Sequence, residues 1–143
     1  VISAIGIGGL IGRLVIGPIS DRIGRKNSVV LALLIETLAF LAMAAANNLW
    51  MLYPAVAAFG FAYGGGVVVF PPLVADLFGR AYAGAIVGRI FATSGTMAAI
   101  GPYAAQLLKD AFGNYRWALI LSGLANGLAL LLATQLPRMP RRS

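Results

Sequence analysis

The chain has 143 residues, of which 60% are hydrophobic and 10% are charged, and it carries a formal net charge of +7. Its mean hydropathy of +0.89 is far from that of soluble domains, in which about 25% of residues are charged. Such a chain cannot cover a core with polar side chains, so its composition predicts an integral membrane protein. The sequence has no cysteine and no histidine, so we expect neither a metal centre nor a cofactor.

Five apolar stretches are each long enough to cross a bilayer, which takes about 20 mostly apolar residues. One such stretch is also typical of a buried helix in a soluble protein, but five in succession with short connectors favour a membrane bundle. The stretches cover residues 1–20, 28–46, 50–71, 83–107 and 117–136. We therefore expect an all-α transmembrane unit over residues 1–143.

The basic residues predict the orientation, because cytoplasmic loops carry an excess of lysine and arginine. Seven lie in the first connector, the third connector and the tail: Arg22, Arg25, Lys26, Arg80, Arg138, Arg141 and Arg142. The other two connectors hold only Lys109 and Arg116. We expect a multi-pass protein of a bacterial inner membrane with a cytoplasmic carboxy terminus. Because the basic residues form small groups at helix ends rather than one basic face, nucleic acid is not an expected partner.

The chain begins at Val1 inside an apolar stretch. With the orientation above, an odd number of spans places this end outside the cell. That arrangement fits a chain cut after an earlier helix, and we expect the sequence to be part of a longer protein.

The first connector, GPISDRIGRK over residues 17–26, is a charged loop between two apolar spans. Asp21 is its only acid. A carboxylate at this position can meet the positive N-terminal end of a neighbouring helix, an interaction worth roughly 0.3–1 kcal/mol when exposed. Gly17 and Gly24 permit backbone turns and close helix approach that a Cβ would block.

This loop resembles the signature of the major facilitator superfamily of secondary transporters. The matching residues are Gly17, Asp21, Arg22, Gly24, Arg25 and Lys26. In that family the motif lies between the second and third helices and often again between the eighth and ninth. Four further spans and a basic tail follow the loop here. The resemblance therefore implies helices eight to twelve, without the seventh helix and the amino-terminal half.

The resemblance also implies that the loop is a gating motif. In the family its aspartate latches the two halves on the cytoplasmic side in the outward-facing state. The partner of Asp21 would then be a helix of the absent amino-terminal half. Arg25 would pair with an acid of its own half, for which Asp76 is the candidate at that membrane face. For Arg22 and Lys26, the alternative is that their charge only sets the orientation.

Charged residues inside the spans are functional candidates, because insertion of each costs about 2.5–3.5 kcal/mol. Arg89 lies near the start of its span and can extend to the interface. Arg13 lies deeper, about 12 Å from Asp21 at 1.5 Å per residue. Its spacing from the loop resembles the eighth helix of the oxalate/formate and monocarboxylate branches of the superfamily. The resemblance implies that Arg13 binds a substrate carboxylate, which a guanidinium can hold through two hydrogen bonds.

Oxalate/formate antiporters have a lysine in the eleventh helix where this chain has Ser94. This difference favours a monocarboxylate or another small organic anion over a dicarboxylate. Glu36 is a rival partner for Arg13, because antiparallel helices joined by the loop would hold both at similar depth. We therefore hypothesise an intramembrane Arg13–Glu36 ion pair. The alternative is that Glu36 reaches a lipid headgroup or a neighbouring subunit.

The third span contains FGFAYGGGVVVFPP over residues 59–72, a composition that favours close packing and bending. In the family this helix lines the cavity, which implies that Tyr63 and Phe70 contact substrate. Simple packing is the alternative. In the fourth span, Gly84 and Gly88 predict a contact face of small residues.

We expect secondary transport of a small solute, an organic anion such as a monocarboxylate, by alternating access. The expected partners are the lipid bilayer, the absent amino-terminal half, the solute, and a coupling proton or counter-anion. The alternatives are a non-transporting receptor or assembly subunit of the same fold and an exporter of uncharged or drug-like compounds. An enzyme is not expected, because the sequence offers no catalytic constellation.

Overall fold

The computed structural model describes residues 2–136, and every regular element in that range is an α-helix. The helices are α1 (Ile2–Ile23), α2 (Arg25–Ala45), α3 (Leu49–Phe78), α4 (Arg80–Phe112) and α5 (Arg116–Thr134). Each is long and apolar enough to cross a membrane. A helix satisfies its own backbone hydrogen bonds where the bilayer offers no water. The prediction of an all-α protein with five spanning helices is confirmed.

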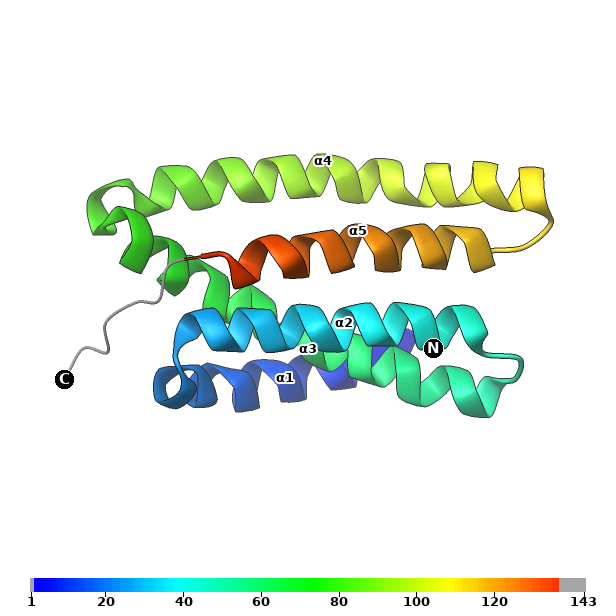
Figure 1. Cartoon of the computed structure of the whole chain (residues 1–143), viewed down its shortest axis with the longest axis horizontal. Coiled ribbons are helices and arrows are strands. Elements are labelled where there is room, and N and C mark those ends of the chain that lie inside the picture. The colour runs from blue at the N-terminus through cyan, green and yellow to red at the C-terminus, as the bar shows by residue number, and fades with distance from the viewer. Residues whose placement is uncertain (1, 137–143) are drawn as a thin grey trace.

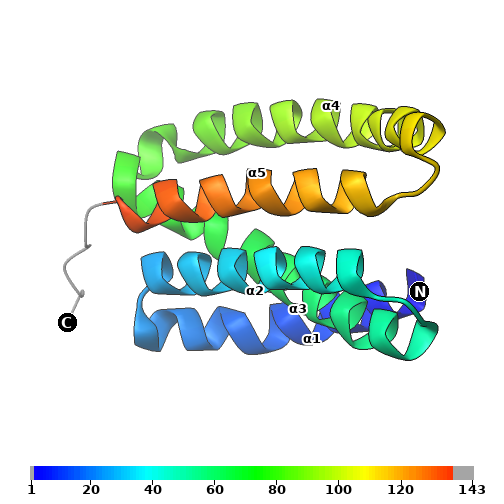
Figure 2. The ribbon, with the colours of Figure 1, turned by 45° about the vertical axis from the view of Figure 1, so that its right-hand side comes forward.

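The five helices run up and down, so that successive connections lie at alternate ends of the bundle (Figures 1 and 2). The α1–α2 and α3–α4 connections lie at the same end as the last turn of α5. The predicted cytoplasmic residues of the first and third connectors therefore share one end. Arg138, Arg141 and Arg142, which belong to the same predicted group, lie outside the described residues.

Two of the connections are single glycines. Gly24, with φ of 93°, joins α1 to α2, and Gly79, with φ of 84°, joins α3 to α4. This left-handed region is open to glycine at little cost. The sequence predicted a connector over residues 72–82, but α3 continues through Pro71 and Pro72 to Phe78. A proline φ near −65° is itself helical, so the helix can continue while losing backbone hydrogen bonds.

The central helix is α3, which packs against α1, α2 and α4. The helices α1 and α2 contact each other far less than each contacts α3. A buried cluster of Ile16, Val29, Val69 and Leu73 joins these three helices close to the charged loop. The loop is thus anchored on a packed core.

The backbones of α1 and α3 lie in close contact. Four glycines of this interface have no room for a Cβ: Gly8 and Gly12 on α1, and Gly60 and Gly64 on α3. A Cβ on Gly60 would lie 2.5 Å from the carbonyl oxygen of Ile5, and one on Gly12 would overlap the carbonyl of Phe61. Small residues at helix interfaces let membrane helices gain van der Waals contact along their backbones.

Within residues 2–136, two predicted close contacts of small residues do not form. A Cβ added at Gly84 or Gly88 meets no atom within 4 Å, because α4 lies at the edge of the described bundle and buries none of its residues. A Cβ at Gly17 would meet only Val68 Cγ1, at an ordinary 3.8 Å. Close approach ends before Gly17 because the side chain of Ile16 fills the space against α3.

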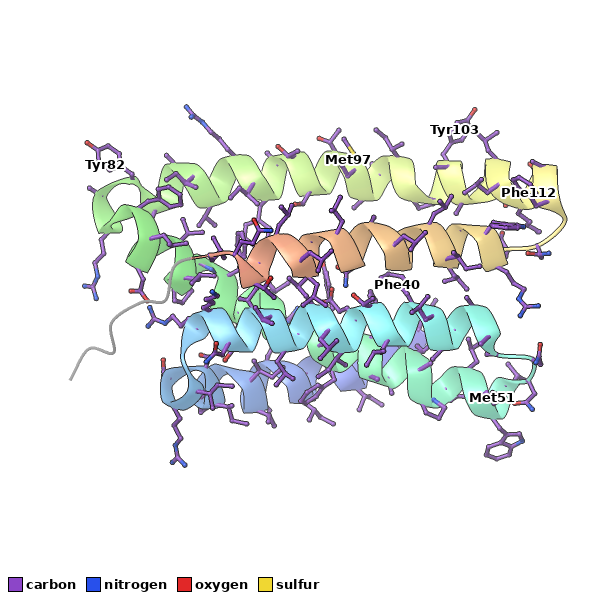
Figure 3. The ribbon with its side chains drawn as sticks, in the orientation of Figure 1. Phe40, Met51, Tyr82, Met97, Tyr103 and Phe112 are labelled. Carbon is purple, nitrogen blue, oxygen red and sulfur yellow. The ribbon has the colours of Figure 1, made fainter. Side chains whose placement is uncertain are left out.

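The outer face of α4 is open. Figure 3 shows Tyr82, Met97 and Tyr103 pointing away from the other helices, and these residues are 70%, 61% and 68% exposed. Apolar and aromatic side chains at this exposure suit contact with lipid or with another protein segment.

The α1–α3 interface predicts a strong effect of one added methyl group. Gly12→Ala should lower the free energy of unfolding by about 1–3 kcal/mol, the usual cost of overpacking, since the new Cβ meets backbone that cannot rotate away. Thermal unfolding of the detergent-solubilised protein would measure this effect. Gly6→Ala is the matched control, because a Cβ there meets nothing within 4 Å. Equal unfolding temperatures for the two variants would contradict the close contact.

Candidate functional site

The charged loop is tied to α3 by Arg25. Its Nη1 lies 2.6 Å from Oδ2 of Asp76 and also donates to the carbonyl oxygen of Pro72 at 3.2 Å. The side chains of Arg25 and Asp76 are 33% and 30% exposed, so the contact is partly shielded from water. Hydrogen bonds between ionised groups are stronger than neutral ones. The predicted Arg25–Asp76 contact is therefore present, and it joins the start of α2 to the last turns of α3.

Asp21 has a different environment. Its Oδ1 lies 3.8 Å from Nη2 of Arg25, and its side chain is 71% exposed. At that exposure the contact contributes little. Arg22 beside it is also exposed. The structure thus divides the motif, with Arg25 held inside the bundle and Asp21 presented outward.

Two buried serines flank the loop. The hydroxyl of Ser20 donates to the carbonyl oxygen of Gly17 at 2.6 Å, and that of Ser28 donates to the carbonyl oxygen of Gly24 at 3.2 Å. Buried polar groups need such partners. Each serine is satisfied by its own segment, so α1 and α2 can approach α3 closely on both sides of the turn.

Lys26 and Arg116 join α2 to α5 at opposite ends of this helix pair. Lys26 Nζ donates to the carbonyl oxygens of Thr134, at 2.8 Å, and Leu136. At the other end, Nε of Arg116 donates to the carbonyl oxygen of Ala44 at 2.8 Å. Each cation thus satisfies carbonyl groups at the C-terminal end of the antiparallel neighbour. Lys26 therefore has a structural contact that the sequence analysis did not foresee.

Midway between these ends, Asn126 of α5 binds α2. Its Nδ2 donates to the carbonyl oxygen of Leu33 at 3.1 Å and to Oγ1 of Thr37 at 3.2 Å. Polar side chains commonly hydrogen-bond across helices in membranes. The sequence analysis missed this contact, although an amide in the middle of an apolar span was the signal that could have revealed it.

The hypothesised Arg13–Glu36 ion pair does not form. Within residues 2–136, the ion pairs join Arg25 to Asp21 and to Asp76. Glu36 is half-buried, and its Oε1 lies 4.0 Å from the position of a Cβ on Gly66 of α3, while Arg13 is exposed on α1. Similar depth in the membrane does not bring the two side chains together, because α1 and α2 each pack mainly against α3 rather than against each other.

The predicted substrate residues lie on three helices. Arg13 on α1 and Ser94 on α4 are exposed, and Tyr63 on α3 is 53% exposed. Tyr63 stacks on Phe59 with ring centroids 5.8 Å apart. No hydrogen bond or ion pair joins the three exposed residues in the described part of the chain. The fourth candidate, Phe70, lies edge-on to a phenylalanine of α4.

Phe70 contacts Phe91 of α4, and the centroids of the two rings lie 6.5 Å apart. The contact joins α3 to α4 near the charged end. It gives Phe70 a packing contact, and its contact with substrate stays a prediction.

Comparisons with known proteins agree with these features. The sequence profile of the Major Facilitator Superfamily matches residues 1–143. The Glucose transporter GlcP of Staphylococcus epidermidis is 29% identical over 99% of this chain and 31% of its own length. The Oxalate:formate antiporter of Oxalobacter formigenes is 32% identical over 87% of this chain and 30% of its own length.

A plant protein, Probable inositol transporter 2 of Arabidopsis thaliana, is 28% identical over 94% of this chain and 23% of its own length. The chain therefore spans about a third or less of the length of these three relatives.

The Arg25–Asp76 contact predicts coupled mutational effects. Arg25→Gln and Asp76→Asn should each lower the free energy of unfolding. In the double variant the loss should be about 1 kcal/mol smaller than the sum of the two single losses, because the ion pair is already broken by the first change. Chemical or thermal unfolding in detergent would measure the cycle. Arg22→Gln, which changes an exposed neighbour, should leave stability unchanged. Additive losses for the two partners would contradict the pair.

Proposed function

Because this chain belongs to the major facilitator superfamily, we propose that it is the carboxy-terminal part of a secondary transporter that moves a small solute by alternating access. The relatives above are named as transporters or antiporters, and this family is not one of enzymes. Five apolar helices make the chain an integral membrane protein. The excess of basic residues at one end supports a cytoplasmic carboxy terminus in a bacterial inner membrane.

The proposed substrate is a small organic anion such as a monocarboxylate. The observation that carries this proposal is the exposed guanidinium of Arg13 midway along α1, with no acid paired to it among the described residues. A cation inside a membrane is expensive unless it finds a partner, and a transported carboxylate can accept two hydrogen bonds from it. Gly12 packs against α3 and so holds this part of α1 in place.

A second candidate is a sugar or polyol. Its support is the glucose and inositol transporters among the relatives. Such a substrate would use hydroxyl contacts, for which Tyr63 and Ser94 are suitable donors and acceptors, and would leave Arg13 for a structural task.

The gating proposal concerns Asp21, whose side chain points away from the bundle, and the open face of α4. The absent amino-terminal half would bring the N-terminal end of a helix to the carboxylate of Asp21 in the outward-facing state, where charge and helix dipole attract. The same half would cover apolar residues of α4 such as Met97. The 71% exposure of Asp21 supports this arrangement, because the carboxylate remains available for a partner.

The role of Arg13 can be tested by transport. The full-length protein in proteoliposomes should take up a radiolabelled monocarboxylate, and Arg13→Gln should lower the rate at least tenfold, since a hydrogen bond to a charged group contributes about 1.5–3 kcal/mol. Arg89→Gln should keep most of the rate. Glucose uptake that is unaffected by Arg13→Gln would favour the sugar alternative. No flux of either solute would favour a non-transporting receptor.

The gate can be tested with a thiol probe in a cysteine-free background. Asp21→Asn should weaken cytoplasmic closure, so a cysteine introduced at Ser94 should react faster with a membrane-impermeant reagent from the cytoplasmic side, and transport should slow. Asp110→Asn, which changes an acid at the opposite end, should alter neither readout. Unchanged labelling in Asp21→Asn would contradict the proposed latch.

A further inference from the structure

A cavity of about 500 Å³ lies where α2 ends and α5 begins, at the end of the bundle opposite the charged loop. The cavity is open to its surroundings rather than enclosed, and its volume is within the range of ligand pockets, roughly 300–1,000 Å³. The cavity has an apolar wall that includes Leu41 and Ile120, and a polar rim formed by Asn114 and Arg116. Its lining is therefore amphipathic.

The position of the cavity matches the edge of the membrane. Arg116 and Trp117 lie in the first turn of α5, and the cavity extends from them to Ile120, about one turn further along this apolar helix. Tryptophan is enriched at this level of the bilayer, where one part of the ring is apolar and the other meets water. Figure 3 shows Phe112 at the same end, and its ring lies 5.5 Å from that of Trp117. The polar rim thus lies at headgroup level and the aliphatic wall at acyl-chain level.

The guanidinium of Arg116 is held in place for binding. Its Nε donates to the carbonyl oxygen of Ala44 at 2.8 Å, and its backbone N–H donates to Oδ1 of Asn114 at 3.0 Å. Within residues 2–136, its two terminal nitrogens donate to no protein acceptor, so both remain available. A planar fork with free N–H groups suits a phosphate, which it can bind through two parallel hydrogen bonds.

The neighbouring charges are engaged elsewhere. Lys109 Nζ lies 5.0 Å from the ring centroid of Tyr115. The carboxylate of Asp110 accepts a hydrogen bond from Nε2 of Gln106 at 2.9 Å. No acid lines the cavity in the part of the chain that the structure describes. Arg116 is therefore the cation that the cavity presents to a ligand.

We propose that this cavity binds an anionic membrane phospholipid, with Arg116 paired to the headgroup phosphate and the first acyl carbons packed against Leu41 and Ile120. A lipid matches both parts of the lining, whereas a free anion would use only the rim. A zwitterionic headgroup carries the same phosphate, but its own ammonium cation offsets the attraction to Arg116, so the site favours an anionic lipid. The bilayer also presents the lipid at the level of the site. This site is separate from Arg13 and the charged loop, so it does not depend on the proposed transport function.

The test uses the full-length protein in nanodiscs, in a variant whose only tryptophan is Trp117. Its fluorescence is measured with brominated phosphatidylglycerol and with brominated phosphatidylcholine at equal mole fractions. The anionic lipid should quench with about fivefold higher apparent affinity, since one basic residue near an anionic lipid contributes about 1 kcal/mol. Arg116→Gln should remove this preference, and Arg116→Lys should retain part of it because charge remains but the fork is lost.

Lys109→Gln is the matched control, because it removes the other cation at this end and should leave the preference unchanged. Quenching by brominated phosphatidylcholine in Arg116→Gln would show that Trp117 still lies in the bilayer in this variant. A preference that survives Arg116→Gln, or that disappears equally in Lys109→Gln, would overturn the proposal. It would also be overturned if inorganic phosphate abolished the preference, or if neither lipid quenched because protein covers the cavity.

Discussion

The close backbone contact between α1 and α3 is the constraint on which the rest of this structure depends. Bilayer lipid is as apolar as the helices, so association relies on close packing rather than on escape from water. Gly12 and Gly60 provide that packing because neither carries a side chain that would separate the backbones. With α1 and α3 at this distance, the charged loop must end beside the last turns of α3. That position brings Arg25 to Asp76.

A different kind of interaction holds α5. This helix packs mainly against α2, where polar contacts lie at both ends and in the middle: Lys26, Asn126 and Arg116. All three reach backbone carbonyl oxygens, including those that a helix leaves unpaired at its C-terminal end. The same geometry prepares the proposed lipid site, because the bond from Nε of Arg116 to Ala44 fixes the guanidinium and leaves its outer nitrogens free.

The charged loop combines a fixed and an open part. Arg25 is tied to α3 at 2.6 Å, while Asp21, one turn earlier, is 71% exposed. The proposed gate would use this division, since one group would hold the loop in register while another binds and releases a partner. If the loop has two states, its partner can shift them only by the difference between its affinities for each state.

The sequence alone was sufficient for the class of protein, the helix number and the family, because hydropathy and the loop motif are local signals. It also predicted the Arg25–Asp76 contact, since few acids are available at that membrane face. It could not identify the helix faces that pack together, because glycines are frequent throughout the chain and Gly84 looks no different from Gly12 in a one-dimensional pattern.

Only the tertiary structure decided which of these residues meet. Equal depth suggested an Arg13–Glu36 pair, but depth is one coordinate and rotation about each helix axis is another. Side chains of α1 and α2 at the same level can therefore face different neighbours. They do so here because both helices pack mainly against α3. The contacts of Lys26, Asn126 and Arg116 likewise depend on α2 and α5 lying side by side. The sequence determined what each helix is, and packing determined what each side chain touches.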